Sequence, residues 1–280
     1  MSTTVAITAA DINKLRQATS AGMMDCRKAL IESNGDFEAA IDWLRKQGQK
    51  LAAKRSDREA KEGVIVAKTT DDHKTGFIVC VSCETDFVSK SPDFVAFGQS
   101  IANAAVSNNV KSIEELNEVV INGSKVSELV NDKLAAIGEK IGITRFERIE
   151  APYIASYIHG AFRLGVLVAL NKEAAEAGKD IAMQIAALNP LAVDAASIPV
   201  ATIDRERAIV VDTMKADPKM AGKPHDMIVK IAEGKLNVFF KEQTLLAQPF
   251  VKDSSLSVAD YLKSVNADLK VIEFKRVALG

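Results

Sequence analysis

The chain has 280 residues and a mass of 30.1 kDa, a length that allows about two compact domains or several smaller modules. Hydrophobic residues make up 48% of it and charged residues 26%, which is typical of a globular protein and excludes a chain that is disordered throughout. The 36 basic and 37 acidic side chains leave a net charge of -1, which argues against a protein built mainly to coat nucleic acid.

Signals for export and for membrane insertion are missing from the sequence. No apolar stretch approaches the roughly 18 to 20 residues that cross a bilayer, and Met1 to Ala10 lack the basic start and apolar block of a secretion signal. Three cysteines, Cys26, Cys80 and Cys83, are too few for a disulfide scaffold and fit a reducing compartment. We therefore expect a cytoplasmic protein that contacts no membrane.

The first predicted elements are three short helices. Thr8 to Asp11 is typical of a helix start, Asn34-Gly35 of a helix end, and Asp36 of an N-cap. Apolar residues recur with helical spacing between Phe37 and Leu44, so the third helix should bury one face. We expect residues 1–54 to form a helical module and the start of a basic linker.

The linker is expected within residues 45–61, which carry seven basic and two acidic side chains. Two interpretations stay open here: a solvated extension of the third helix, or a segment that contacts RNA or phosphate. No aromatic residue lies within it, which disfavours a groove that stacks single-stranded bases.

The middle of the chain predicts an α+β fold with antiparallel sheets. Residues 63–68 and 77–83 are apolar or β-branched runs around a polar turn, so they predict a hairpin. Ser91-Pro92 then begins the first of three helices, the second of which opens with the capping box Ser112 to Glu115. We assign core subdomain 1 to residues 55–142.

A similar order repeats in the second half. Strands are expected around Ile143–Ile149, Tyr153–His159 and Leu164–Leu170, followed by a helix. The run from Gly76 to Val81 parallels the run from Gly165 to Leu170, which suggests an internal duplication. We assign core subdomain 2 to residues 143–195 and 235–280, with strands at Leu245–Val251 and Lys270–Val277 completing its sheet.

Residues 196–234 predict an inserted helical hairpin. Two amphipathic stretches, Ile203–Met214 and Met227–Phe240, flank Pro218 and Pro224, which cannot lie inside a helix. The hairpin could project as an antiparallel coiled coil or pack flat on the second subdomain. A projecting coiled coil would put one set of apolar residues against another: Ile203, Val210 and Met214 facing Ile228, Ile231 and Ala232.

The sequence contains few candidate catalytic residues. His73, His159 and His225 have no serine or cysteine placed beside them by a known signature, and no phosphate-binding glycine loop occurs, so we expect neither an enzyme nor a nucleotide, cofactor or metal site. Cys80 and Cys83 form a C-x-x-C pair that could belong to a thiol or zinc enzyme. In an extended strand, however, they point to opposite faces roughly 10 Å apart, which favours two structural cysteines.

Phe87 lies in a polar segment between a strand end and a helix start. It either folds back into the core or stands exposed and inserts into a partner, as aromatic anchors do at interfaces. The carboxylate of Asp86 beside it would suit competition with magnesium or phosphate. The residue pattern leaves both fates open.

Five motifs resemble, in order, those of bacterial translation elongation factor Ts, and together they span nearly the whole chain. They lie at Thr19–Leu30, Cys83–Val88, Tyr157–Val168, Gly222–Pro224 and Glu233–Lys252. The resemblance implies an N-terminal module of the ubiquitin-associated (UBA) type, two α+β core subdomains and an inserted coiled coil. It also implies guanine-nucleotide exchange on elongation factor Tu, without bond chemistry.

The resemblance further implies the residues that touch elongation factor Tu. Asp86 and Phe87 would intrude between helices of the partner's GTP-binding domain, near its magnesium and phosphate site. The same comparison assigns partner contacts to a larger set: Thr85, Val88, Arg16, Met23, Met24, His159, Phe250 and Val251. Met23 and Met24 could equally be core of the helical module, and without the resemblance His159 reads as a hydrogen-bonded strand-end histidine.

Three further expectations stay beside this interpretation. The chain could instead be an RNA-associated or adaptor scaffold without exchange activity. The hairpin could pair two copies of the chain or contact the partner. Because longer family members carry another C-terminal helix after the position of Gly280, we expect either a lower affinity for the partner or an affinity that depends more on the core.

Overall fold

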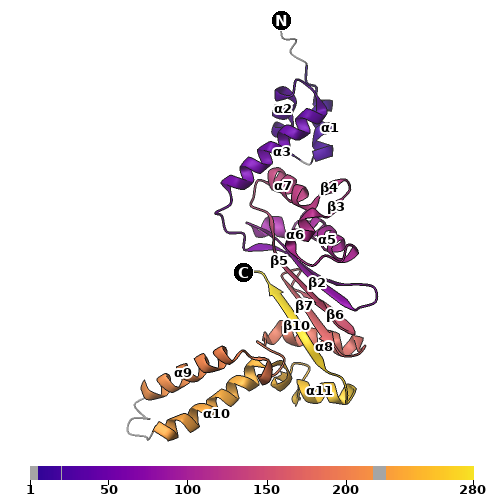
Figure 1. Cartoon of the computed structure of the whole chain (residues 1–280). Coiled ribbons are helices and arrows are strands. Elements are labelled where there is room, and N and C mark those ends of the chain that lie inside the picture. Colours follow the sequence, from indigo (N-terminus) through magenta and orange to yellow (C-terminus); the bar gives the residue numbers. More distant parts are fainter. Residues whose placement is uncertain (1–5, 20, 217–224) are drawn as a thin grey trace.

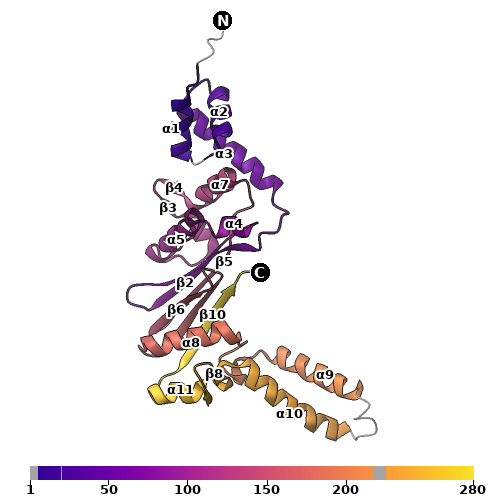
Figure 2. The same cartoon turned by 180° about the vertical axis from the view of Figure 1, so that it is seen from behind.

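The computed structural model describes residues 6–19, 21–216 and 225–280 (Figure 1). Three helices stand at one end, two antiparallel sheets with their covering helices form the middle, and a helical hairpin extends from the other end (Figures 1 and 2). The expected α+β class is confirmed.

The N-terminal module consists of the three predicted helices: α1 (Ala9–Thr19), α2 (Met23–Glu32) and α3 (Phe37–Lys54). Thr8 and Asp11 cap α1 reciprocally, because the Asp11 N–H donates to Thr8 Oγ1 at 3.2 Å and the Thr8 N–H to Asp11 Oδ2 at 3.0 Å. Asp36 caps α3 by accepting the Ala39 N–H at 2.8 Å. Helix α3 continues to Lys54, so the helix-extension interpretation is correct for residues 45–54 and the linker begins only at Arg55.

The first sheet has the strand order β1-β2-β5 and is antiparallel: β1 (Glu62–Thr69), β2 (Thr75–Cys83) and β5 (Gly142–Glu150). The assignment of residues 143–150 to the second subdomain is therefore wrong. Phe146 of β5 pairs with Val79 of β2, and its ring packs against Phe77. The pairing is needed because β1 covers only one edge of β2, and the backbone groups of the other edge also need hydrogen-bond partners. The boundary between the subdomains moves to Ala151.

Helices of subdomain 1 cover the outer face of this sheet, with a small two-stranded ribbon between the last two. They are α4 (Asp86–Ser89), α5 (Pro92–Ser107), α6 (Ile113–Glu118) and α7 (Val126–Ile137), with the ribbon β3 (Val120–Ile121) and β4 (Ser124–Lys125). Phe77, Val79 and Val81 of β2 are buried against Phe94 and Ile101 of α5. The capping box at Ser112 forms only in part, because the Glu115 carboxylate accepts the Lys111 N–H instead.

The second sheet has the order β6-β7-β10 and is also antiparallel: β6 (Tyr153–His159), β7 (Leu164–Leu170) and β10 (Val271–Ala278). Helices α8 (Ala175–Leu188) and α11 (Val258–Val265) lie on its outer side. The expected strand at Leu245–Val251 does not join this sheet. Leu245–Ala247 form a 3₁₀ turn, and β8 (Pro249–Phe250) pairs instead with β9 (Asp253–Ser257).

The two sheets pack face to face through Ile65 and Ile78 of the first and Ile154 and Leu167 of the second. Both are buried on two faces, which explains why β2 and β7 are nearly continuous apolar runs. Both sheets have the same order, with a hairpin followed by a third strand beside its second strand, although the repeated motif did not predict the third strand of the first sheet.

The two glycines of the repeat occupy equivalent places at this interface. Gly76 is the second residue of β2 and Gly165 the second residue of β7. A Cβ atom on Gly76 would lie 2.8 Å from Ile154 Cγ2, and one on Gly165 would lie 2.8 Å from Ile65 Cγ2. Glycine at these positions lets the sheets approach closely.

The hairpin consists of α9 (Val200–Ala216) and α10 (His225–Gln243), which lie side by side and project away from the sheets (Figures 1 and 2). Met214 and Ala232 are buried between the helices, and the hairpin extends away from the sheets instead of packing flat on them (Figures 1 and 2), while a coiled-coil geometry stays a prediction. Helix α10 runs on to Gln243, beyond the expected boundary at residue 234. The 217–224 segment with both prolines, the motif Gly222–Pro224 within it, and the Ile228 side chain lie outside the described residues.

Within the described ranges, none of the helices is long and apolar enough to cross a membrane.

Candidate protein-binding surface

Phe87 stands on the surface: 85% of its area is exposed. It is the second residue of α4, the single helical turn that follows β2. Val88 packs toward the core of subdomain 1 and Ser89 is buried, with its hydroxyl donating to the Asp86 carbonyl at 3.1 Å. Because the neighbouring residues turn inward, the Phe87 ring is left pointing outward. Of the two fates predicted for Phe87, the exposed one is observed.

The base of this turn is held by Glu139, which follows the glycine that ends α7. Its carboxylate accepts the N–H groups of Glu84 and Thr85 at 3.1 and 3.0 Å and the Thr85 hydroxyl at 2.7 Å. Cys83 adds a contact from its thiol to the Thr85 carbonyl at 3.3 Å. The exposed ring therefore stands on a braced backbone.

Asp86 is ionised and reaches the surface. Its carboxylate accepts a hydrogen bond from Lys90 Nζ at 2.7 Å, one helical turn later, and this bond together with the lysine charge lowers the pKa of Asp86. The side chain is nearly half exposed. Asp86 and Phe87 thus present a negative charge and an apolar ring side by side.

His159 ends β6 and is exposed. Its Nδ1 lies 3.0 Å from the Tyr157 hydroxyl, which makes it a hydrogen-bonded strand-end histidine, as the residue pattern alone suggests. The turn that follows is unusual, since Gly160, Ala161 and Phe162 all have positive φ values, of 61°, 51° and 69°. Non-glycine residues adopt this region at a cost, so neighbouring contacts must hold the turn.

Those contacts join the His159 turn to the strand beside the Phe87 loop. The Phe162 carbonyl accepts the Ile65 N–H of β1 at 2.8 Å, and Arg163 Nη1 lies 2.6 Å from Glu62 Oε2. Glu62 pairs in register with Cys83, which directly precedes the segment that carries Phe87. The fold therefore brings the His159 turn and the Thr85–Val88 loop to the same end of the sheets.

Arg16, Met23 and Met24 lie on the surface of the N-terminal module. Met23 is 52% exposed and Met24 is 71% exposed, while Cys26 and Leu30 of the same helix fill the module's core. Of the two alternatives for the methionines, surface exposure is the one found. Methionine is a flexible and polarizable side chain that suits a contact with another helix.

Phe250 requires a correction. Its ring is only 3% exposed and stacks on Tyr261 with the centroids 4.0 Å apart, inside the core beneath α8 and α11. The expected side-chain contact with a partner is therefore contradicted for Phe250. Val251, next to it, is 46% exposed, and its N–H donates to Gln184 Oε1 at 2.8 Å. The two residues differ because β8 ends at Phe250, and Val251 lies in the turn that follows it.

The cysteines lie on opposite faces of β2, as the strand geometry predicts. Cys80 belongs to the core between the sheets and Cys83 to the core beneath α5. Burial, together with the charges of Glu139 and Glu62, raises the pKa of the Cys83 thiol to about 12, so it stays protonated. Among the residues that the structure describes, no three His, Cys, Asp or Glu side chains gather into a group that could hold a metal.

Sequence reasoning missed the groups that hold the Phe87 loop in place. Nothing in the sequence around Glu139 indicates its role, apart from its position directly after Gly138, the glycine that ends α7. Arg55 and Arg58 appeared only as members of a basic stretch, yet both bind Glu84, with nitrogen–oxygen distances of 2.7 and 3.0 Å. Ion pairs between residues 26 to 29 positions apart follow from tertiary structure and leave no local pattern.

Taken with the fold, these groups define an α+β protein that presents an exposed aromatic ring and a carboxylate side by side on a braced turn. A family model described as Elongation factor TS matches residues 84–280. Elongation factor Ts of Christiangramia forsetii is 47% identical over 277 residues, covering 98% of this chain and 99% of that relative. The same-named proteins of Flavobacterium psychrophilum and Amoebophilus asiaticus are 46% and 45% identical, over 98% and 99% of this chain and 99% and 100% of their own lengths. The chain therefore belongs to the elongation factor Ts family, a family of translation elongation factors.

Proposed function

We propose that this chain is a guanine-nucleotide exchange factor for elongation factor Tu, and that it acts by binding its partner without catalysing bond chemistry. The observation that carries the proposal is the Phe87 ring, which is exposed on a braced turn with the Asp86 carboxylate beside it. Membership of the elongation factor Ts family supports elongation factor Tu as the partner.

The exposed ring acts as a wedge. In a GTP-binding protein, Mg²⁺ bridges the phosphates of the nucleotide to side chains whose positions depend on neighbouring helices. Insertion of Phe87 between such helices shifts them and weakens the hold on the metal and on GDP. Every ~1.4 kcal/mol lost from nucleotide binding speeds its release by up to about tenfold when association is unchanged.

The coupling works in both directions. If the exchange factor weakens GDP binding, then GDP or GTP must weaken binding of the exchange factor by the same free energy. The factor therefore binds nucleotide-free elongation factor Tu most tightly and leaves when nucleotide returns. This behaviour needs no nucleotide site on the chain itself.

Further contacts hold the partner while the wedge is in place. Thr85 and Val88 flank the wedge, and the His159 turn lies at the same end of the sheets. Arg16, Met23 and Met24 supply a second surface on the N-terminal module, and exposed Val251 supplies a third. Phe250 is not part of this proposed interface, because its ring is used within the core.

Two measurements test the exchange function directly. The chain should accelerate release of a fluorescent GDP analogue from elongation factor Tu in a stopped-flow experiment, in a manner that saturates with its concentration. The two proteins should also co-purify without nucleotide and separate when GDP is added. Release at the spontaneous rate would overturn the proposal.

The ion pairs of the basic segment argue against the alternative of an RNA-associated scaffold. Arg55 and Arg58 bind Glu84, and Lys61 binds Glu59 at 2.6 Å, so these cations already have acidic partners. A gel shift with steep salt dependence would be needed to favour it.

Self-association through the hairpin stays a prediction that the exposed apolar side chains of α9 and α10 motivate. Ile209, Met227 and Val238 are each about half exposed. Sedimentation at increasing protein concentration would detect dimers, and their absence at high concentration would leave the hairpin as a partner contact or a spacer.

A further inference from the structure

The N-terminal module contacts the core where two helices, α3 and α7, cross. At Gly48 of α3, a Cβ atom would lie 3.0 Å from Ala135 Cβ and 3.3 Å from the Asn131 carbonyl oxygen of α7. Helices approach this closely only where one side chain is a hydrogen atom. Gly48 therefore marks the point where the two helices are in closest contact.

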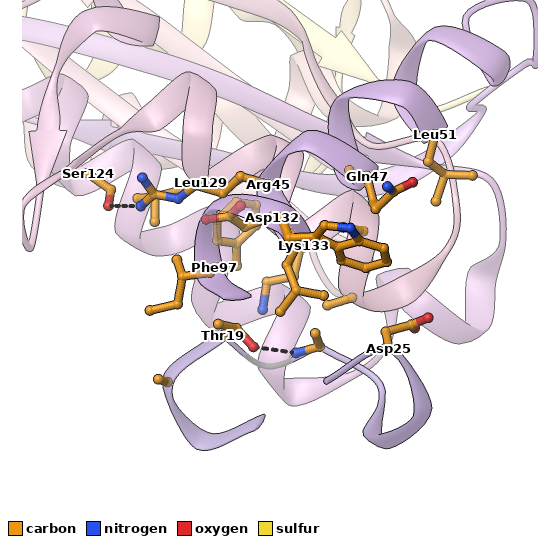
Figure 3. Close-up of a pocket in the computed structure, with 18 of the residues that line it drawn as sticks. Thr19, Asp25, Arg45, Gln47, Leu51, Phe97, Ser124, Leu129, Asp132 and Lys133 are labelled. Carbon is orange, nitrogen blue, oxygen red and sulfur yellow. Dashed lines mark hydrogen bonds between the residues drawn. The ribbon is translucent and has the colours of Figure 1, made fainter. Parts of the chain in front are cut away.

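Beside this crossing the seam between the module and the core is not filled. A cavity of about 570 Å³ lies there, lined by α3, α7 and neighbouring segments. Figure 3 shows Arg45, Asp132, Lys133 and Phe97 around it. The hydrogen bond across the seam from Arg45 Nη2 to Ser124 Oγ is long, at 3.4 Å. Beyond the crossing, Leu51 and Ala52 of α3 pack against the core of subdomain 1, so with a cavity on one side the angle of α3 depends on contacts toward its C-terminal end.

A second attachment lies at the C-terminal end of α3 and is centred on Glu84. Arg55 and Arg58, at the end of the helix, donate to its two carboxylate oxygens at 2.7 and 3.0 Å, and the Lys140 N–H donates to Oε1 at 2.6 Å. The Glu84 and Arg55 side chains are only 16% and 20% exposed, so solvent screens their bond little, whereas Arg58 is 56% exposed and its bond is more strongly screened. Lys140 Nζ closes the cluster by donating to the Arg58 carbonyl at 2.9 Å.

Glu84 also directly precedes Thr85, the residue at which the Phe87 loop begins. The same residue thus contacts the C-terminal end of α3, which joins the module bearing Met23 and Met24 on α2 to the core, and it lies at the base of the wedge. The contacts at Gly48 in α3 and at Arg55, its C-cap residue, lie at two places along the helix axis. Together they fix the direction of α3, which a contact at one place would leave undetermined.

We propose that Glu84 is a positioning residue that fixes α3, and with it the Met23–Met24 surface, relative to Phe87, so that both surfaces meet one partner as a rigid unit. This inference deepens the proposed exchange function and rests on it. Pre-organised surfaces bind more tightly because the cost of ordering them is met on folding. The wedge itself keeps its support from Glu139.

Two substitutions separate alignment of the module from support of the wedge. Glu84→Ala should raise the concentration of the factor that gives half-maximal acceleration of GDP release by about tenfold, because the module loses its alignment. The maximal release rate should change less than about twofold, since Glu139 still holds Thr85. Glu139→Ala should show the opposite pattern, with a lower maximal rate.

Non-additivity gives a second readout that general loss of stability would not reproduce. If Glu84 acts through the arginines, the double variant Arg55→Ala/Arg58→Ala should match Glu84→Ala, and combining all three should add little. The control is Glu118→Ala, which removes an ion pair to Lys125 elsewhere in subdomain 1 and should behave as wild type.

A measurement without the partner separates this inference from the exchange function. Amide hydrogen exchange at residues 52–58 should accelerate more than about tenfold in Glu84→Ala, while exchange at residues 85–89 stays near wild type. Unchanged exchange at 52–58, or a loss confined to the maximal release rate, would overturn the positioning role. If the wild-type chain does not accelerate GDP release from elongation factor Tu, the exchange function is refuted. The hydrogen-exchange measurement still decides the role of Glu84, because it needs no partner.

Discussion

Removal of the Phe87 ring tests the proposed wedge most directly. Aromatic side chains lose about 150 to 250 Å² of surface when protein encloses them, and this ring starts at 85% exposure. At about 25 cal/mol per Å², enclosing ~150 Å² stabilises the complex by ~4 kcal/mol. Ordering the side chain costs about 1 kcal/mol. The remaining ~3 kcal/mol corresponds to a roughly 100-fold loss of acceleration in Phe87→Ala.

The assay is stopped-flow release of a fluorescent GDP analogue from elongation factor Tu, with the factor varied until acceleration saturates. Because the ring is used in the complex from which GDP leaves, Phe87→Ala should mainly lower the maximal rate. Folding should be nearly unaffected, since truncating an exposed side chain usually changes the free energy of unfolding by less than about 0.5 kcal/mol. Thermal unfolding followed by circular dichroism checks this.

Leu191→Ala is a suitable control, because Leu191 is exposed and apolar but lies outside the proposed interface. It should accelerate GDP release as the wild type does. The wedge would be refuted if Phe87→Ala folds normally and reaches the same maximal release rate as the control.

Three other predictions concern stability. Phe250→Ala should lower the free energy of unfolding by ~3 to 5 kcal/mol in urea titrations, because it empties a core site, whereas an unchanged free energy would contradict its burial. Gly165→Val should cost ~1 to 3 kcal/mol in the same titrations, since its Cβ would lie 2.8 Å from Ile65 Cγ2; full stability would show that the sheets can separate freely. Burial raises the pKa of Glu84, but the Lys140 N–H and the guanidinium groups of Arg58 and Arg55 outweigh it and hold the pKa at about 2, below the ordinary 4.5. The folded state thus favours ionised Glu84, so its contribution to stability is present above pH 4.5 and is lost as the pH falls toward 2. Comparing thermal midpoints at pH 7 and pH 3 should show a smaller acid-induced drop in Glu84→Gln than in wild type, and equal drops would contradict the prediction.

Most helices and strands could be predicted from the sequence because each depends on neighbours in the chain, although α4 and α11 were not predicted. The spacing of apolar residues from Phe37 to Leu44 and the cap at Asp36 predict α3, and the alternation in β2 places Cys80 and Cys83 on opposite faces. Where the prediction failed, the deciding contact was distant. Residues 143–150 carry a strand pattern, but only pairing with β2 assigns them to the first sheet.

Two aromatic residues of the candidate site also show the difference between what the local sequence predicts and what distant contacts decide. Phe87 and Phe250 both lie in motifs shared with the family, and neither local sequence states whether the ring is exposed. Phe87 points outward because Val88 and Ser89 occupy the inward positions of a single helical turn. Phe250 is enclosed because Tyr261, eleven residues later in the chain, returns to stack on it.

The amino-acid sequence on its own determined the family, the α+β class, the repeated strand that has glycine near its start, and the position of the Phe87 loop. The tertiary structure alone decided which strands share a sheet, which aromatic ring reaches solvent, and how Glu84 and Glu139 hold the loop. The reason is physical. Caps and periodicity act over a few residues and are visible in one segment, whereas burial and ion pairing depend on what the rest of the fold places nearby.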